Sequence, residues 1–184
     1  MRVDQFSSWL TVDAKGLYCR PGGFHIDPYG GAERAVITHG PDPARPGHEH
    51  VLATAETLEV MKTRLETVAT LGTQTAAYGE PLQVGDVTVT LVPAGHVLGS
   101  AQVLLEWKGA RVVVSGDYKR STDSTCPGFE VLPCHLFITE ATFGLPVFQH
   151  GEAREEVAKL LRSRAPSPSE RTWSACTISA NASA

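Results

Sequence analysis

The sequence has no long apolar run, no excess of basic residues and no closely spaced cysteine pair. A helix that spans a bilayer needs about 20 consecutive apolar residues, and no run in the 184 residues approaches that length. Sixteen basic residues face 20 acidic ones, for a net charge of −4. This balance argues against proteins that hold nucleic acid through a broadly basic surface, although a local nucleic-acid site remains compatible with it.

The cysteine pattern also excludes a class of fold. Cys19, Cys126, Cys134 and Cys176 form no Cys-x-x-Cys pair. This spacing predicts reduced thiols in a cytoplasmic protein, and neither a disulfide framework nor a cysteine-based zinc site. The opening MRVDQFSSWLTVDAKG has no apolar segment behind a basic start, so no secretory signal is expected.

Short apolar or alternating segments separated by turns predict a chain rich in strands. Strands are expected on both sides of the Pro-Gly-Gly turn within residues 16–28, and at residues 35–38, 51–53, 87–92, 102–107, 111–115 and 136–139. Thr54 is a suitable N-cap for a helix that places Leu58, Met61 and Leu65 on one face, and a second helix is expected over residues 152–162. Many short strands with two or three helices are typical of an α/β or α+β sandwich.

Polar residues follow several of these strands or lie in the adjoining loops: His39, His96, Asp117 and Glu140, with Asp27, Asp42, His48 and His50 around them. In α/β folds the carboxyl ends of strands line the ligand crevice. Imidazole and carboxylate groups are ligands that Zn²⁺ accepts while one position stays open for water. Bound Zn²⁺ lowers the pKa of that water to about 7, which provides a nucleophile at neutral pH.

Ordinary roles for the same residue types stay open at this point. A loop histidine is commonly solvated or hydrogen-bonded, and we expect this of His25, His135 and His150. Asp27 and Asp117 also suit turn positions. Spacing alone does not decide between a metal site and these roles.

A resemblance to a known family rests on several segments that occur in order: AVITHGPDPARPGH, VPAGHVLGSAQV, VSGDYK and ITEATFGLPVF. They resemble the metallo-β-lactamase-fold nucleases of the β-CASP group, and most of all the bacterial exonuclease associated with DNA ligase. GLYCRPGGFHIDP is similar to that family's opening, so the resemblance covers about residues 16–162. It implies a two-zinc phosphodiesterase on an αββα sandwich, with a β-CASP cap domain that follows Glu140 in the family and is missing here.

The resemblance also implies partners and ligands. The substrate would be DNA or RNA, with an ATP-dependent DNA ligase and a helicase as associated proteins and no membrane. His39 and Asp42 match the first histidine and the aspartate of the family's HxHxDH motif. His96 matches a later zinc histidine, and Asp117 matches the carboxylate that bridges both zinc ions.

Three further residues match positions near the metals. Asp27 matches a structural aspartate, and Glu140 matches the acidic residue that opens the β-CASP region. The resemblance implies that Glu140 handles a proton or supports the ligands, and that Asp42, Asp117 and Glu140 form the catalytic set. His48 lies in the ARPGH segment that commonly follows the motif, and is not a ligand in the family.

The HxHxDH motif is incomplete here. Residues 39–43 are HGPDP, so proline stands where the second and third histidines belong. Proline has no side-chain donor atom and fixes φ. One Zn²⁺ would keep His39, His96 and Asp117, whereas the other would keep only Asp42 and Asp117. We therefore expect at most one Zn²⁺ and an impaired exonuclease; the alternatives are a non-catalytic remnant or another hydrolase on the same fold.

The composition changes after Arg162, where the sequence becomes SRAPSPSERTWSACTISANASA. Few large apolar residues and no periodicity predict a disordered tail, which follows an incomplete metallo-β-lactamase-like domain at residues 1–162. A second hypothesis is a frameshift. The tail can be encoded so that a neighbouring frame gives VARSFPERTHLVGVYDLGKRQR, which resembles the family's continuation.

Overall fold

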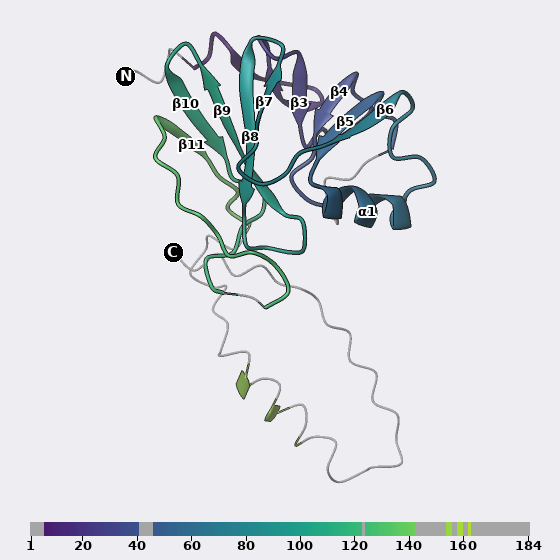
Figure 1. Ribbon diagram of the computed structural model, residues 1–184, viewed down its shortest axis with the longest axis vertical. Helices are drawn as coiled ribbons and strands as arrows, with labels where there is room; N and C mark the ends of the chain where they lie inside the picture. The colour runs from purple at the N-terminus through teal and green to yellow at the C-terminus, as the bar shows by residue number, and fades with distance from the viewer. Residues whose placement is uncertain are drawn as a thin grey trace.

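The strands of this chain form two sheets that pack face to face (Figure 1). The computed structural model describes residues 6–40, 46–122, 124–142, 154–155, 158–159 and 162. Sheet A has the strand order β1-β2-β3-β4-β5-β6, and sheet B has the order β11-β10-β9-β8-β7. The α/β sandwich expected from the sequence is confirmed.

Sheet A brings the ends of two neighbouring strands to one edge. Its strands are β1 (Leu10–Asp13), β2 (Gly16–Cys19), β3 (Phe24–Ile26), β4 (Arg34–Val36), β5 (His50–Ala53) and β6 (Gly72–Thr75). The first three pair antiparallel, and β3 to β6 pair parallel. Because β3 and β4 run in the same direction, the residues that follow them emerge side by side at one edge of the sheet.

Sheet B also brings the ends of several strands, three in this case, to one edge. Its members are β7 (Pro81–Val84), β8 (Val87–Pro93), β9 (Ala101–Trp107), β10 (Ala110–Val114) and β11 (Leu136–Ile138). Strands β7 to β10 pair antiparallel, so β8 and β10 share a direction, and β11 pairs parallel with β10. The segments after β8, β10 and β11 therefore leave at a common edge.

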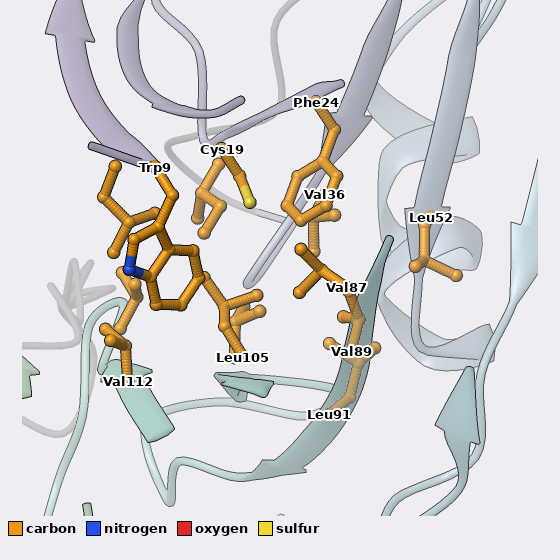
Figure 2. Close-up of a cluster of buried hydrophobic side chains, with 14 of the residues drawn as sticks. Trp9, Cys19, Phe24, Val36, Leu52, Val87, Val89, Leu91, Leu105 and Val112 are labelled. Atoms are coloured by element: carbon orange, nitrogen blue, oxygen red, sulfur yellow. The ribbon is translucent and has the colours of Figure 1, made fainter. Parts of the chain in front are cut away.

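The main core lies between the sheets (Figure 2). Alternation in VTVTLV directs Val87, Val89 and Leu91 of β8 inward, where they are almost completely buried. Phe24 and Val36 of sheet A pack in the same cluster. Each such side chain contributes about 1.5–3 kcal/mol when it is removed from water, so this interface fixes the sheets relative to each other.

Helix α1 (Ala55–Arg64) covers the other face of sheet A. Its N-cap is Thr54, as the sequence predicts, and Thr54 Oγ1 accepts a hydrogen bond from the Thr57 N–H at 3.2 Å. Leu58 and Met61 are buried against apolar residues of β4 and β5. Sheet A is thus packed on both faces at β4 and β5.

Most predicted strands are present with shifts of one or two residues at their ends. Strand β4 ends at Val36 rather than Thr38, because the Thr38 N–H leaves the sheet and donates to Asp27 Oδ1. Strands β1, β6 and β7 were not predicted. Of the helix expected over residues 152–162, the described positions 154–155, 158–159 and 162 are helical. The rest of that segment and the tail at 163–184 lie outside the described residues.

Within the described part of the chain, no helix has the length and apolar character needed to cross a bilayer.

Candidate metal centre

The ends of five strands place polar side chains near one edge of the sandwich. Asp27 follows β3 directly, and His39 lies three residues beyond the end of β4. His96, Asp117 and Glu140 follow β8, β10 and β11 of sheet B. Both sheets therefore supply residues to this region.

Three of these side chains meet. His39 Nε2 lies 3.6 Å from Asp117 Oδ2, and His96 Nε2 lies 3.8 Å from the same oxygen. The candidate ligand atoms of the three residues all lie within 4.8 Å of one another, and the two imidazole rings are nearly perpendicular, at 89°. The predicted convergence of these residues is confirmed, whereas their role as ligands stays a prediction.

The spacing and the donor types fit a zinc ion. Tetrahedral Zn²⁺ with bonds of about 2.0–2.2 Å separates its ligand atoms by roughly 3.4 Å, close to the two histidine–aspartate distances. Two neutral nitrogen donors and one carboxylate oxygen form a set found in hydrolytic zinc sites, which use three protein ligands and leave room for water. The two histidine–aspartate distances would have to shorten by a few tenths of an ångström, and the two histidine nitrogens, which lie within 4.8 Å of each other, would have to approach by up to about 1.4 Å.

Thr38 determines which nitrogen of His39 faces the cluster. Its hydroxyl donates to Asp27 Oδ2 at 2.6 Å, and its backbone N–H donates to Asp27 Oδ1 at 2.8 Å. The same hydroxyl oxygen lies 3.0 Å from His39 Nδ1. Because the hydroxyl proton is directed at Asp27, the oxygen accepts from Nδ1–H, and Nε2 keeps its lone pair for the cluster.

Asp27 is a half-buried residue in a left-handed backbone conformation, with φ of 44°. Burial raises the pKa of Asp27 to about 7, against the two hydrogen bonds from Thr38 that lower it, and the charge of Asp117 adds a smaller increase. Burial therefore favours the uncharged form of this carboxyl more than in a solvated aspartate. A cation among the three ligand atoms would favour its charged form.

The loop that carries His96 is held by the start of helix α1. The carbonyl oxygen of Gly99 accepts hydrogen bonds from Thr54 Oγ1 at 2.7 Å and from Thr57 Oγ1 at 2.9 Å. Ser100 Oγ accepts from the N–H groups of His96 and the next residue, both at 3.1 Å. These contacts fix the backbone of His96 before any ligand binds.

Asp117 opens onto a cleft of about 350 Å³ between the first strands and the ends of β10 and β11. Asp27 and Glu140 line the same cleft. Glu140 Oε2 accepts a hydrogen bond from the Thr142 N–H at 2.8 Å, while its buried Oε1 has no hydrogen-bond partner among the described residues. Glu140 therefore lies in the cleft next to the cluster of His39, His96 and Asp117, as the sequence predicts, and its chemical role stays a prediction.

Two further residues considered in the sequence, Asp42 and His48, are not placed in the cluster. Asp42 and the prolines on either side of it lie outside the described residues, so its place in the catalytic and metal sets stays a prediction. His48 is buried and accepts a hydrogen bond from the Ala32 N–H at Nδ1, at 3.2 Å. Burial lowers the pKa of His48. His48 is not part of the three-residue cluster.

The other histidines have ordinary contacts. His25 Nε2 lies 3.0 Å from Asp13 Oδ2, and His135 Nδ1 accepts a hydrogen bond from the Arg111 N–H at 2.9 Å. His50 is exposed on β5, and His150 lies outside the described residues. None of the three described histidines belongs to the cluster.

Sequence reasoning did not identify three residues that support the cluster: Thr38, Thr57 and Gly99. Thr38 directly precedes His39, and Gly99 lies three residues after His96. Their closeness in the chain to the candidate ligands could have identified these two residues. Thr57 is far from His96 in the sequence and meets its loop only through tertiary structure.

Comparison with known proteins finds relatives of this chain by sequence. No family model matches the chain. "Endoribonuclease YSH1" of Kluyveromyces lactis is 36% identical over 84 residues, covering 45% of this chain and 11% of that protein. "Cleavage and polyadenylation specificity factor 73" of Drosophila melanogaster is 31% identical over 109 residues, covering 58% and 15%. The chain is a relative of the β-CASP nucleases.

A further relative, matched over more residues, is named as a DNA ligase rather than a nuclease. "Probable DNA ligase" of Opitutus terrae is 31% identical over 140 residues, which cover 75% of this chain and 14% of that protein. The chain thus spans between 11% and 15% of the length of these three relatives. The resemblance to the β-CASP group predicted from the sequence is confirmed.

Two solved structures overlap half of the chain. Zn²⁺-bound PqqB from Methylobacterium extorquens has a TM-score of 0.41 and 16% identity, over 50% of this chain and 40% of that one. The metallo-β-lactamase fold protein YhfI from Bacillus subtilis has a TM-score of 0.38 and 14% identity, over 50% and 43%.

Proposed function

We propose that the chain is the metal-binding part of a metal-dependent DNA exonuclease, and that it holds a single Zn²⁺ ion. The observation that supports this most directly is the cluster of His39, His96 and Asp117, whose ligand atoms lie within 4.8 Å of one another. The names of the relatives, an endoribonuclease and a probable DNA ligase, support a nucleic-acid substrate.

The chain's own residues would hold and orient the reacting groups. His39 and His96 supply neutral nitrogen donors, and Thr38 keeps His39 in the tautomer that binds through Nε2. When bound, Zn²⁺ supplies a Lewis acid and lowers the pKa of a coordinated water. Glu140 offers a carboxylate in the adjoining cleft that can accept a proton during attack on the phosphodiester.

The incomplete motif limits the proposed activity. Proline replaces two expected histidine donors within HGPDP, so a second ion would lack most of its nitrogen ligands. Without it, the attacking and leaving oxygens lose one half of a two-metal clamp. We therefore expect little or no nuclease activity from the 184-residue chain, even where one Zn²⁺ binds.

The same replacement favours a second candidate, a non-catalytic remnant that binds no metal. Zinc content distinguishes the two. We expect close to one Zn²⁺ per chain after dialysis, measured by mass spectrometry of the metal, and none for the remnant. His39→Ala should lose that zinc, whereas His135→Ala, a matched control outside the cluster, should keep it.

Digestion is tested by repair of the sequence. Labelled single-stranded DNA and RNA are incubated with excess Zn²⁺ or Mn²⁺, with the present chain and with one in which HxHxDH replaces the Pro41–Pro43 region and the alternative frame is restored. Digestion of DNA from an end by the repaired chain alone supports the proposal. Strong chelator-sensitive digestion by the present chain would show that the motif damage does not matter, and inactivity of the repaired chain would favour the remnant.

An ATP-dependent DNA ligase and a helicase are proposed as partners, and the cytoplasm as the location. The name of the Opitutus terrae relative supports the ligase, while the helicase depends on the family resemblance and the location on the cysteine pattern. Co-purification of tagged chain with a ligase from the source cells tests the first of these.

A further inference from the structure

Tyr29 is a large aromatic side chain at the rim of the cleft that Asp117 opens onto. It is 78% exposed, and it lines this cleft together with Asp27, Asp117 and Glu140. Val12 of β1, which is 80% exposed, lines the same cleft. Two large apolar surfaces are therefore left in water directly beside a group of carboxylates.

The exposed ring of Tyr29 is supported on the chain. The Tyr29 N–H donates to the Lys15 carbonyl at 2.9 Å, which ties its backbone to the turn between β1 and β2. The ring lies over Gly16, where an added Cβ would be 3.7 Å from Cδ2 and 3.8 Å from Cε2. Gly16 has φ of +118°, a conformation that favours glycine. The turn thus forms a shelf beneath the tyrosine ring.

The position of the Tyr29 ring beside the cleft suits a single-stranded nucleic acid. Exposed tyrosines are common, but an aromatic ring held at the rim of the cleft beside the candidate metal ligands resembles the platforms on which proteins stack single-stranded bases. Every base has a π-face, so such a contact does not depend on sequence. Lys15 is exposed on the supporting turn and adds a positive charge there, which would attract a phosphate backbone.

We propose that Tyr29 is a binding residue that stacks on a base of a single-stranded nucleic acid, next to the phosphodiester that enters the cleft at Asp117. This inference rests on the proposed nuclease function and adds the form of the substrate and one contact. The contact requires an unpaired base, so duplex ends would have to be opened before they occupy the site.

The test is the affinity of the complete chain for fluorescein-labelled 12-mers of deoxythymidine and of uridine, measured by anisotropy. Binding is measured in EDTA and again with Zn²⁺. Tyr29→Ala should raise Kd by roughly 5- to 150-fold, the effect expected for loss of one base–aromatic stack. Tyr29→Phe and Tyr29→Trp should retain affinity within about 3-fold, because both keep an aromatic face.

Two controls separate stacking from general damage. Leu71→Ala removes another exposed apolar side chain, 67% exposed and outside this cleft, and should leave Kd unchanged. A 12-mer with abasic sites should bind wild type and Tyr29→Ala equally. Binding of the normal oligonucleotides with no effect of Tyr29→Ala would overturn this inference alone. Failure of wild type to bind any oligonucleotide in either buffer would overturn it together with the proposed function.

Discussion

The hydroxyl group of Thr38 links the half-buried carboxyl of Asp27 to the ring of His39. In Thr38→Val the side chain keeps its shape, but His39 loses the acceptor that selects its tautomer and Asp27 loses a donor. Zinc affinity should fall about 10- to 100-fold, as for the loss of other groups that orient a metal-binding histidine. Competition with a zinc-binding dye measures this.

Thr38→Ser is the matched variant because it keeps the hydroxyl. Its zinc affinity should stay within a few-fold of wild type, and equal losses in the two variants would contradict the hydrogen-bond explanation. The Val variant should also be less stable by about 1–3 kcal/mol, because a buried carboxyl oxygen is left with fewer donors. Urea unfolding in EDTA measures that difference.

Asp27 should make the stability of the metal-free protein depend on pH. Its pKa is about 7 in the folded chain and 3.8 as the ordinary value, so the folded state binds the proton more tightly than the unfolded state does. The stabilising contribution is complete below pH 3.8 and is lost as pH rises towards 7. Between these two pH values the free energy of unfolding should fall by up to about 1.4 kcal/mol for each unit of pH increase.

Asp27→Asn removes this titration and suits the left-handed backbone at that position. Urea unfolding in EDTA at several values between pH 4.5 and 7.5 should show a flatter dependence for the variant than for wild type. Parallel curves would mean that the carboxyl is ionised throughout this range.

At this scale the sequence predicted the residues that come together but not those that support them. His39, His96 and Asp117 were identified from their residue types, their place after strands and the family resemblance. Thr57 was assigned only to the α1 segment, because its contact with the Gly99 carbonyl depends on how helix and loop meet in space. No local pattern encodes such a contact.

The His96 loop and helix α1 act as one element, because the Gly99 carbonyl is shared by two threonine hydroxyls. Gly99 has φ of +81°, and an added Cβ would lie 2.6 Å from the Thr57 backbone nitrogen. Gly99→Ala should therefore lower stability by about 2–4 kcal/mol, by strain and by displacement of the loop. It should also weaken zinc binding.

Gly109→Ala provides the comparison. Gly109, in the β9–β10 turn, has a similar φ of +76°, but an added Cβ meets nothing within 4 Å. Gly109→Ala should lower the free energy of unfolding by about 1 kcal/mol, from the left-handed conformation alone. Its zinc affinity should be unchanged. Thermal unfolding and zinc competition on both variants test the difference, and equal effects would show that the loop does not depend on the helix contact.

Strand β8 was predictable from its buried face, whereas two of the three missed strands, β6 and β7, are exposed edge strands. The alternation of VTVTLV in β8 reflects its place inside sheet B, next to β7 and β9. Strand β6, GTQT, forms the edge of sheet A and is mostly exposed, so it carries no apolar periodicity. Strand β7 is an edge strand that begins with proline. Such strands are formed by pairing with a neighbour rather than by their own sequence.

Over the whole molecule, the cluster joins the two sheets. His39 extends from sheet A, and His96 and Asp117 extend from sheet B. A cation that binds only the folded chain should stabilise it by about 2.7 kcal/mol at a concentration 100 times its Kd. Thermal unfolding with increasing Zn²⁺ should show this, and Asp117→Asn should reduce the effect strongly. An equal shift in His39→Ala would place the binding elsewhere.

The origin of the three ligand residues also has a consequence for the order of folding. Positions 39, 96 and 117 are far apart in the chain, and they meet only where the sheets have already packed. Closing such long loops is an entropic cost that comes before any binding energy is gained. An ion therefore cannot nucleate this domain. An ion held by these three residues would bind after the sheets have packed and would act by slowing unfolding, so we expect the lifetime of the native state, rather than the speed of its formation, to depend on the metal supply.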